Sequence, residues 1–252
     1  MNSKVYLYDG TYDNFMQLVA KLLSLKIKPL KIVAVDKYVP SLFEDAINLD
    51  VDNYLKNKLI VKLSNKIKKE VFKVYLSENE DKELIIYYFI LNSLKYGDEV
   101  FKMRNLRCVW ELLSISKYVS RECHKFKGFT RFKELKGGIL YAEINPTNNI
   151  LFLLAEHFKN RLAKEYWIIK DINRGIYCIY DKKNYYFTNE NNFKFLDVVI
   201  TNDEQGIEKL WQMFFETVGI KERKNKRCQM NFMPKKYWQC ITEMRDVDEK
   251  SN

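Results

Sequence analysis

The sequence predicts an α+β fold: a helix-rich N-terminal half that begins as a small α/β unit, and a C-terminal module with a short, mainly antiparallel sheet packed by helices. Three observations lead to this prediction. Apolar residues recur at helical spacing over much of residues 11–125. After residue 129, short strand-like segments separated by turn residues replace that pattern. The 252 residues are 47 % hydrophobic and 30 % charged, which is typical of a folded domain with a sizeable core.

The N-terminal half should open with a strand, a helix and a second strand. Residues 4–8 predict the first strand, with a turn at Asp9-Gly10. Residues 11–25 carry their apolar side chains on one helical face, and residues 31–35 predict the second strand.

Three further helices are expected before the character of the chain changes. Residues 51–76 predict a very basic helix. Residues 77–80 (Ser-Glu-Asn-Glu) have the pattern of a capping box, and the helix that they begin should end at Gly97. A third helix is predicted over 104–125, with Gly128 as its stop.

The second half predicts short strands, two helices and a basic C-terminal stretch. Strands are expected over residues 129–135, 139–144, 166–171, 176–180 and 185–189. Helices are expected over 149–163 and 203–218. We therefore divide the chain into an N-terminal region (1–100), a C-terminal module (101–245) and a frayed tail (246–252), with the transition near residues 100–125.

Several classes of protein are disfavoured by composition. No apolar run reaches the length of a membrane span, and the N-terminus lacks the apolar core of a signal peptide. An odd number of widely spaced cysteines disfavours a disulfide framework and fits a reduced cytoplasm. No CxxC pair occurs, so no zinc ribbon or iron–sulfur cluster is expected, and we predict no cofactor and no metal. The cysteines are Cys108, Cys123, Cys178, Cys228 and Cys240.

A net charge of +10 favours a polyanionic partner, with nucleic acid ahead of a membrane surface. The alternative is that the positive charge only reflects a lysine-rich proteome and indicates no particular partner. The strongest compositional signal is residues 220–240, where cations alternate with aromatic side chains, a mixture that suits phosphates and bases. The competing interpretation of residues 220–240 is a solvated basic face. The lysines between residues 56 and 73 are a weaker candidate and are better explained as a solvated helix surface. The candidate nucleic-acid-binding residues are Lys221, Arg223, Lys224, Lys226, Arg227, Lys235, Lys236 and Trp238.

His157 and Arg161 lie four residues apart on an otherwise apolar helical stripe. An arginine there needs a carboxylate, a phosphate or solvent. The structural interpretation pairs Arg161 with Asp171 or Glu143 and places His157 in the core. The functional interpretation makes Arg161 a phosphate clamp.

Two weaker signals surround these residues. Asp171 ends a predicted strand and Arg174 lies in the following turn, a pattern that also suits a simple Asx turn. His124 neighbours Glu122 and precedes Arg131, which suits either an acid–base pair or a histidine at a helix end. A zinc site that combines Cys123, His124 and His157 has no support from their spacing.

In combination, these residues resemble a bacterial family of DNA-metabolism and DNA-repair proteins. The resemblance spans nearly the whole chain and is most specific in the C-terminal half. Its motifs are Tyr8-Asp9-Gly10-Thr11; Glu122 and His124 followed by Gly128-Phe129-x-Arg131-Phe132; His157-Phe158-x-x-Arg161; Trp167-x-Ile169-x-Asp171-x-x-Arg174; Leu210-Trp211; Ile220-x-Glu222-Arg223-x-Asn225; and Pro234-Lys235-x-Tyr237-Trp238.

The resemblance implies a role in DNA repair or modification. In that family the C-terminal module is also fused to uracil-DNA-glycosylase-type domains, and the stand-alone form is encoded beside a radical-SAM protein. We therefore expect the partners to be DNA and a radical-SAM protein, and not a membrane. The chain would act on or bind DNA together with that enzyme. The alternative is a non-catalytic adaptor that docks the enzyme and presents DNA to it.

The resemblance also suggests one shared polar site. Arg131, Arg161 and Arg174 would gather around a phosphate. His124 and His157 would transfer protons, oriented by Glu122 or Asp171, so that these four are the candidate catalytic residues.

Overall fold

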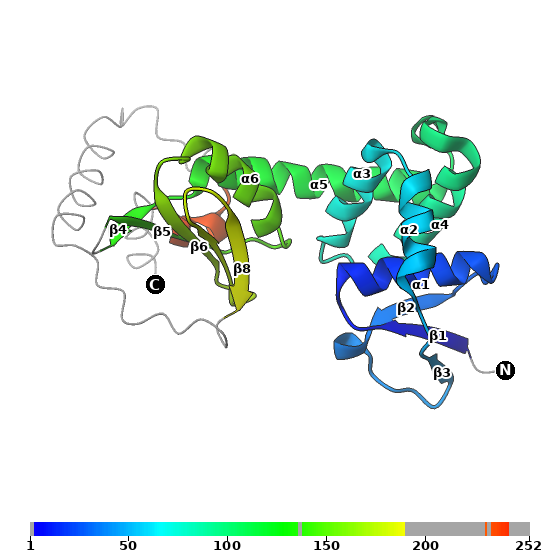
Figure 1. The fold of residues 1–252 in the computed structure, drawn as a ribbon. Coiled ribbons are helices and arrows are strands. Elements are labelled where there is room, and N and C mark those ends of the chain that lie inside the picture. Colours follow the sequence, from blue (N-terminus) through cyan, green and yellow to red (C-terminus); the bar gives the residue numbers. More distant parts are fainter. Residues whose placement is uncertain (1–2, 136–137, 190–229, 231–232, 242–252) are drawn as a thin grey trace. The chain divides into compact units, whose positions relative to one another are not determined.

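The computed structural model describes residues 3–135, 138–189, 230 and 233–241 (Figure 1). It confirms the α+β class. The chain divides into two compact units, Met1–Ser120 and Arg121–Asn252, which we describe separately. The division falls inside helix α5 (Arg107–Phe129), whereas the sequence places the start of the C-terminal module at residue 101.

The first unit is built on a parallel sheet with the strand order β2-β1-β3. Its strands are β1 (Ser3–Tyr8), β2 (Lys31–Ala34) and β3 (Glu44–Ile47). Helix α1 (Tyr12–Ser24) connects the central strand β1 to β2, as predicted. A short 3₁₀ turn, η1 (Val35–Lys37), follows β2. Strand β3 is not predicted, because its sequence Glu-Asp-Ala-Ile contains too few apolar residues to show an alternating pattern.

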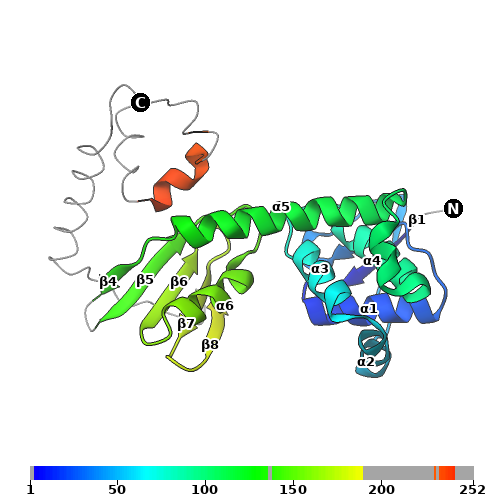
Figure 2. The ribbon, with the colours of Figure 1, turned by 90° about the horizontal axis from the view of Figure 1, so that it is seen from above.

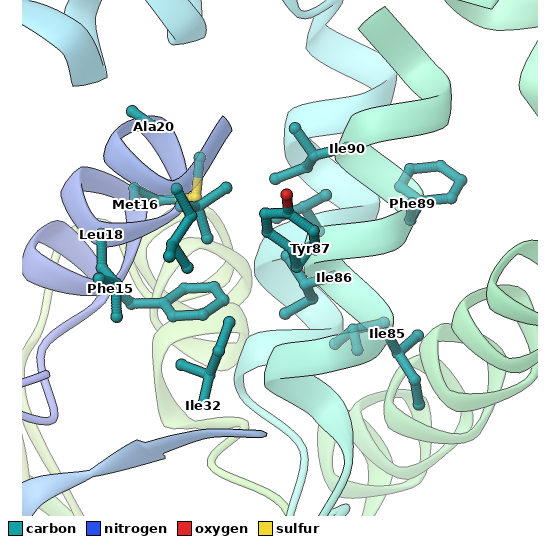
Figure 3. Close-up of a cluster of buried hydrophobic side chains, with 14 of the residues drawn as sticks. Phe15, Met16, Leu18, Ala20, Ile32, Ile85, Ile86, Tyr87, Phe89 and Ile90 are labelled. Carbon is teal, nitrogen blue, oxygen red and sulfur yellow. The ribbon is translucent and has the colours of Figure 1, made fainter. Parts of the chain in front are cut away.

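The core of this unit lies where α1 and the sheet meet helix α4 (Lys82–Tyr96). Figure 3 shows Phe15 of α1 and Ile32 of β2 opposite Ile86 and Ile90 of α4. All four side chains are buried. Helix α4 is apolar around most of its surface, which explains why it occupies the centre of the unit.

The predicted helix over 51–76 is two helices, α2 (Asn53–Lys62) and α3 (Asn65–Tyr75). Leu63 adopts an extended conformation between them. Ser64 then caps α3, since its hydroxyl accepts a hydrogen bond from the Ile67 amide at 3.2 Å. The sequence pattern of residues 51–76 predicts one basic helix and does not identify Ser64 as the cap of a second helix.

Two other helix-end predictions are wrong and one is right. Ser77 does not cap α4, because its hydroxyl donates to the Val74 carbonyl at the end of α3. Gly128 does not stop α5, which continues to Phe129. Gly97, with φ +57°, follows the last residue of α4 as predicted and begins the 3₁₀ segment η2 (Gly97–Lys102).

The second unit contains a five-stranded mixed sheet with the order β4-β5-β6-β7-β8. Its strands are β4 (Lys133–Leu135), β5 (Ile139–Ile144), β6 (Tyr166–Asp171), β7 (Ile176–Tyr180) and β8 (Tyr185–Asn189). Only β5 and β6 are parallel, and helix α6 (Leu151–Arg161) connects them. The other neighbouring pairs are antiparallel, as predicted.

Helix α6 lies against this sheet (Figure 1), and aromatic side chains make the contact. Phe158 of α6 contacts Trp167 of β6, and Phe152 contacts Phe187 of β8. Beyond the sheet, the structure describes the 3₁₀ segment η4 (Lys235–Cys240), which lies beside the C-terminal end of α5 in Figure 2.

The predicted helix over 203–218 lies outside the described residues. Within the described part of the chain, no helix is both long enough and apolar enough to span a membrane.

Two glycines test the account of the backbone. Gly10 follows β1 with φ +87°, and an added Cβ would lie 3.6 Å from an Asp36 carboxylate oxygen, an ordinary contact. Gly10→Ala should therefore destabilise the protein by about 1–2 kcal/mol through backbone strain alone. Gly128 lies within α5 in open space, so Gly128→Ala should stabilise it by about 0.5–1 kcal/mol. Urea denaturation measures the free energy of unfolding of both variants. Changes of the same sign in the two variants would contradict this account.

Candidate functional site

The residues predicted to form one site separate into two groups in the second unit. Glu122 is buried, whereas His124, two residues later on α5, is exposed. Two residues correspond to about 200° around a helix, so these side chains point to opposite sides. Glu122, Asp171 and Arg174 of the predicted site hold a loop, whereas His124 and Arg161 are exposed and His157 is half-buried.

Glu122 binds the loop that leads from β5 into α6, which we call the β5–α6 loop (residues 145–150). Its carboxylate accepts hydrogen bonds from the amides of Thr147 and Asn148, both at 2.9 Å. The Asn148 side chain donates a further bond at 2.6 Å. Lys236 Nζ and the Tyr237 hydroxyl lie 3.4 and 3.5 Å from the same carboxylate oxygen.

These bonds keep Glu122 ionised. Burial acts to raise the pKa of the Glu122 carboxyl, but the amide and side-chain donors and the charge of Lys236 outweigh it and lower the pKa. A carboxylate that is only 3 % exposed and bonded to this many donors has no free oxygen with which to orient a histidine.

Arg174 binds the same loop and is itself held by Asp171. The Asp171 carboxylate accepts a bond from the Asn173 amide and forms a 3.0 Å ion pair with Arg174. The Arg174 guanidinium also donates to the carbonyls of Pro146 at 3.3 Å and Thr147 at 2.5 Å. The turn is thus an Asx turn, but its arginine is only partly exposed and binds the backbone of the loop.

Burial raises the pKa of the fully buried Asp171 carboxyl, and the Arg174 guanidinium opposes this effect. We call the assembly of Glu122, Asp171 and Arg174 around the β5–α6 loop the loop clamp. Its two carboxylates accept bonds from backbone N–H groups, and its guanidinium donates to backbone carbonyls. Each of the three predicted site residues therefore has a structural partner within the chain.

The Pro-Lys-x-Tyr-Trp motif also packs against the protein. Tyr237 is buried against Phe126 and Phe129 of α5. Trp238 is 6 % exposed and donates its indole N–H to the Met233 carbonyl at 2.9 Å. Its ring is not available for base stacking, which corrects the prediction for this residue.

The two described lysines of the predicted basic stretch differ. Lys236 bonds to Glu122 and Thr147, so it serves the loop clamp. Lys235 is exposed, with its ammonium 5.7 Å from the Trp238 ring. The other predicted nucleic-acid-binding cations, Lys221, Arg223, Lys224, Lys226 and Arg227, lie outside the described residues.

Arg131 does not reach a shared site either. It lies before β4 and not on the first strand, and its guanidinium donates to the Gly128 carbonyl at 2.6 Å. This bond satisfies a carbonyl in the last turn of α5, a common role for a cation at a helix C-terminus.

The two histidines and Arg161 of the predicted site belong to neither the loop clamp nor a shared site with it. His157 is half-buried, and its Nε2 atom is buried without a hydrogen-bond partner among the described residues. Burial lowers the pKa of this imidazole, as do the nearby charges of Lys127 and Arg161. No carboxylate contributes to that shift.

Arg161 is exposed and forms no ion pair or hydrogen bond within the described part of the chain. The structural interpretation that paired it with Asp171 or Glu143 is therefore wrong. Asp171 pairs with Arg174, and Glu143 accepts a bond from the Tyr141 hydroxyl.

His124 is exposed and lies more than one helical turn before the end of α5. It therefore neither caps the helix nor bonds to Glu122. Lys127 is three residues further along α5, on the adjacent surface of that helix. We call His124, Lys127, His157 and Arg161 the basic patch.

The basic patch can bind an anion. Lys127 and Arg161 place two positive charges beside the imidazole of His157, and a phosphate at the surface could accept bonds from both cations. Metal binding has no comparable basis, since no three His, Cys, Asp or Glu side chains converge among the residues described. Sequence reasoning missed Lys127, although its spacing of three from His124 was a usable signal.

Glu122→Gln tests the loop clamp. The change removes the charge that binds two amides and Lys236, so it should destabilise the protein by about 3 kcal/mol at pH 7. Glu156→Gln, at an exposed position of α6, is the control and should change stability by less than about 0.5 kcal/mol.

The pH dependence sharpens this test. Because the pKa of Glu122 is lowered on folding, its stabilisation is present above the ordinary glutamate value of 4.5 and is lost as the pH falls through the lowered pKa. The difference in unfolding free energy between wild type and Glu122→Gln should therefore shrink below pH 4.5 in urea titrations. A difference that is independent of pH would contradict this role for the carboxylate.

Comparison with known proteins places this geometry in a family. No curated protein matches the chain. A family model described as a domain of unknown function, DUF4130, matches residues 80–243, well over half of the chain, and includes both the loop clamp and the basic patch. The chain therefore belongs to the DUF4130 family.

Proposed function

We propose that this protein binds DNA through the basic patch, as a component of a DNA repair or modification system. The observation that carries the proposal is the pair of cations, Lys127 and Arg161, beside the imidazole of His157, with no carboxylate contributing to the pKa shift of that ring. Two cations beside an imidazole repel one another unless an anion joins them. A DNA phosphate would supply that anion and accept bonds from both cations.

The partner and the setting follow from the family resemblance of the sequence motifs. We propose that a radical-SAM enzyme supplies the redox chemistry and that the two proteins act on DNA in the cytoplasm. The fusion of similar modules to uracil-DNA-glycosylase-type domains supports a damaged or modified base as the target of the system. The net charge of this chain, +10, also favours association with a polyanion such as DNA.

A second form of this function, a non-catalytic adaptor, is favoured by the loop clamp. Glu122 and Asp171 are the carboxylates predicted to orient the histidines, but Glu122 binds the β5–α6 loop and Asp171 binds Asn173 and Arg174. The basic patch has no carboxylate that shifts the pKa of His157. A histidine without such a partner is poorly placed for acid–base catalysis, so the chain would present DNA to the enzyme that reacts with it.

DNA binding should depend steeply on salt and on Arg161. Fluorescence anisotropy with a labelled oligonucleotide should give a logarithm of affinity that falls linearly with the logarithm of salt concentration. Arg161→Ala should weaken binding by about tenfold or more and reduce the slope by about 0.7–0.9, the contribution of one phosphate contact.

Lys28→Ala is the matched control, because it removes one exposed charge far along the chain from the patch residues. It should change affinity by less than twofold. If Lys28→Ala weakens binding as much as Arg161→Ala, the attraction is diffuse and the basic patch is not the site. If the wild type binds no DNA at low salt, the proposal fails.

The adaptor form makes a separate prediction. The protein alone, incubated with uracil-bearing or abasic oligonucleotides, should leave bases and strands unchanged by mass spectrometry and gel analysis. Product that forms with wild type and disappears with His157→Ala, while the variant still melts like wild type, would show that the chain is an enzyme.

A further inference from the structure

Two large aromatic side chains are exposed on the part of α5 that lies in the first unit. Trp110 is 60 % exposed and Tyr118 is 53 % exposed. Neighbouring residues of the same helix, such as Leu112 and Val119, are fully buried. Two large aromatic rings exposed on one helix that is otherwise well packed form a candidate interaction surface.

These aromatic residues belong to one stripe of the helix. Trp110, Ser114 and Tyr118 follow one another at intervals of four residues, which places them on neighbouring surface positions. The two rings are about 12 Å apart along the helix axis, with the small Ser114 between them. We call the exposed residues Arg107, Trp110, Ser114, Lys117 and Tyr118 the α5 stripe.

The charges of the α5 stripe favour a polyanion. From residue 104 to residue 120, each fully exposed charged residue is a cation: Arg104, Arg107 and Lys117. Glu111 is less exposed and pairs with Arg107 at 2.7 Å. Asp81 also lies near Arg107. A surface pair of this kind is worth little, so Arg107 can exchange Glu111 for a phosphate at small cost.

We propose that the α5 stripe binds unpaired bases of single-stranded DNA. Bases would stack on the faces of Trp110 and Tyr118, while Arg107 and Lys117 neutralise the phosphates between them. Bases in an intact duplex are already stacked on one another, so a duplex gains nothing from these rings. The inference rests on the proposed DNA-binding function and adds to it a preference for strands that are open or frayed.

Anisotropy titrations with a single strand and with a duplex of the same length test this inference. Trp110→Ala should raise the dissociation constant for the single strand by about 5- to 100-fold, the loss expected for one stacked base. The constant for the duplex should stay within twofold of wild type. Trp110→Phe keeps an aromatic face and should retain most of the single-strand affinity.

Tyr186→Ala is the control for general loss of an exposed aromatic ring, since Tyr186 is 54 % exposed on β8, outside the stripe. It should leave both constants unchanged. Thermal melting by circular dichroism should show that each variant remains folded, as expected for exposed positions.

Two outcomes would overturn the inference alone. One is a Trp110→Ala variant that binds the single strand like wild type, as expected if the stripe serves a protein partner. The other is an equal loss for single strand and duplex. In both cases the proposed function stands if Arg161→Ala still weakens binding. A wild type that binds neither oligonucleotide would overturn both proposals.

Discussion

The second unit depends on the interaction of one buried carboxylate with one loop. Glu122, near the end of α5, binds the amides of Thr147 and Asn148 and thereby fixes the β5–α6 loop against that helix. On the other side of the loop, Arg174 binds its carbonyls and is itself held by Asp171. Because α6 begins directly after this loop, the clamp determines where His157 and Arg161 lie relative to the last turns of α5.

The clamp explains why a polar motif pattern need not indicate catalysis. Glu122, Asp171 and Arg174 have the residue types of an active site, yet each is saturated by partners within the chain. A buried ion is tolerated only when its bonds are satisfied, and here the backbone of the loop satisfies them. The groups left for a ligand are the cations and the imidazole of the basic patch, which bind anions without requiring a reaction.

Much of the fold could be predicted because it follows from local patterns. Helix α1 and strands β5 to β8 show their periodicity within a few residues. Strand β3 could not be predicted, because its short polar sequence forms a strand only when it pairs with β1.

The candidate site was harder to predict because its contacts are long-range and involve the backbone. The amides of Thr147 and Asn148 carry no side-chain signal, so sequence patterns give no indication that Glu122 would bind them. One part was accessible: residues two apart on a helix point apart, so Glu122 and His124 could not share a site. The position of Lys127 near His157 depends on the packing of α5 and α6, which the sequence does not specify.

The most direct test of the account is NMR of the imidazole rings during a DNA titration. The chain has only two histidines, so the ring ¹H–¹⁵N spectrum is readily assigned with a His124→Gln variant. If a phosphate joins Lys127 and Arg161 at His157, the His157 ring resonances will shift on DNA addition, and its lowered pKa will rise toward or above the ordinary value. His157 resonances and a His157 pKa that do not change when DNA binds would contradict the account.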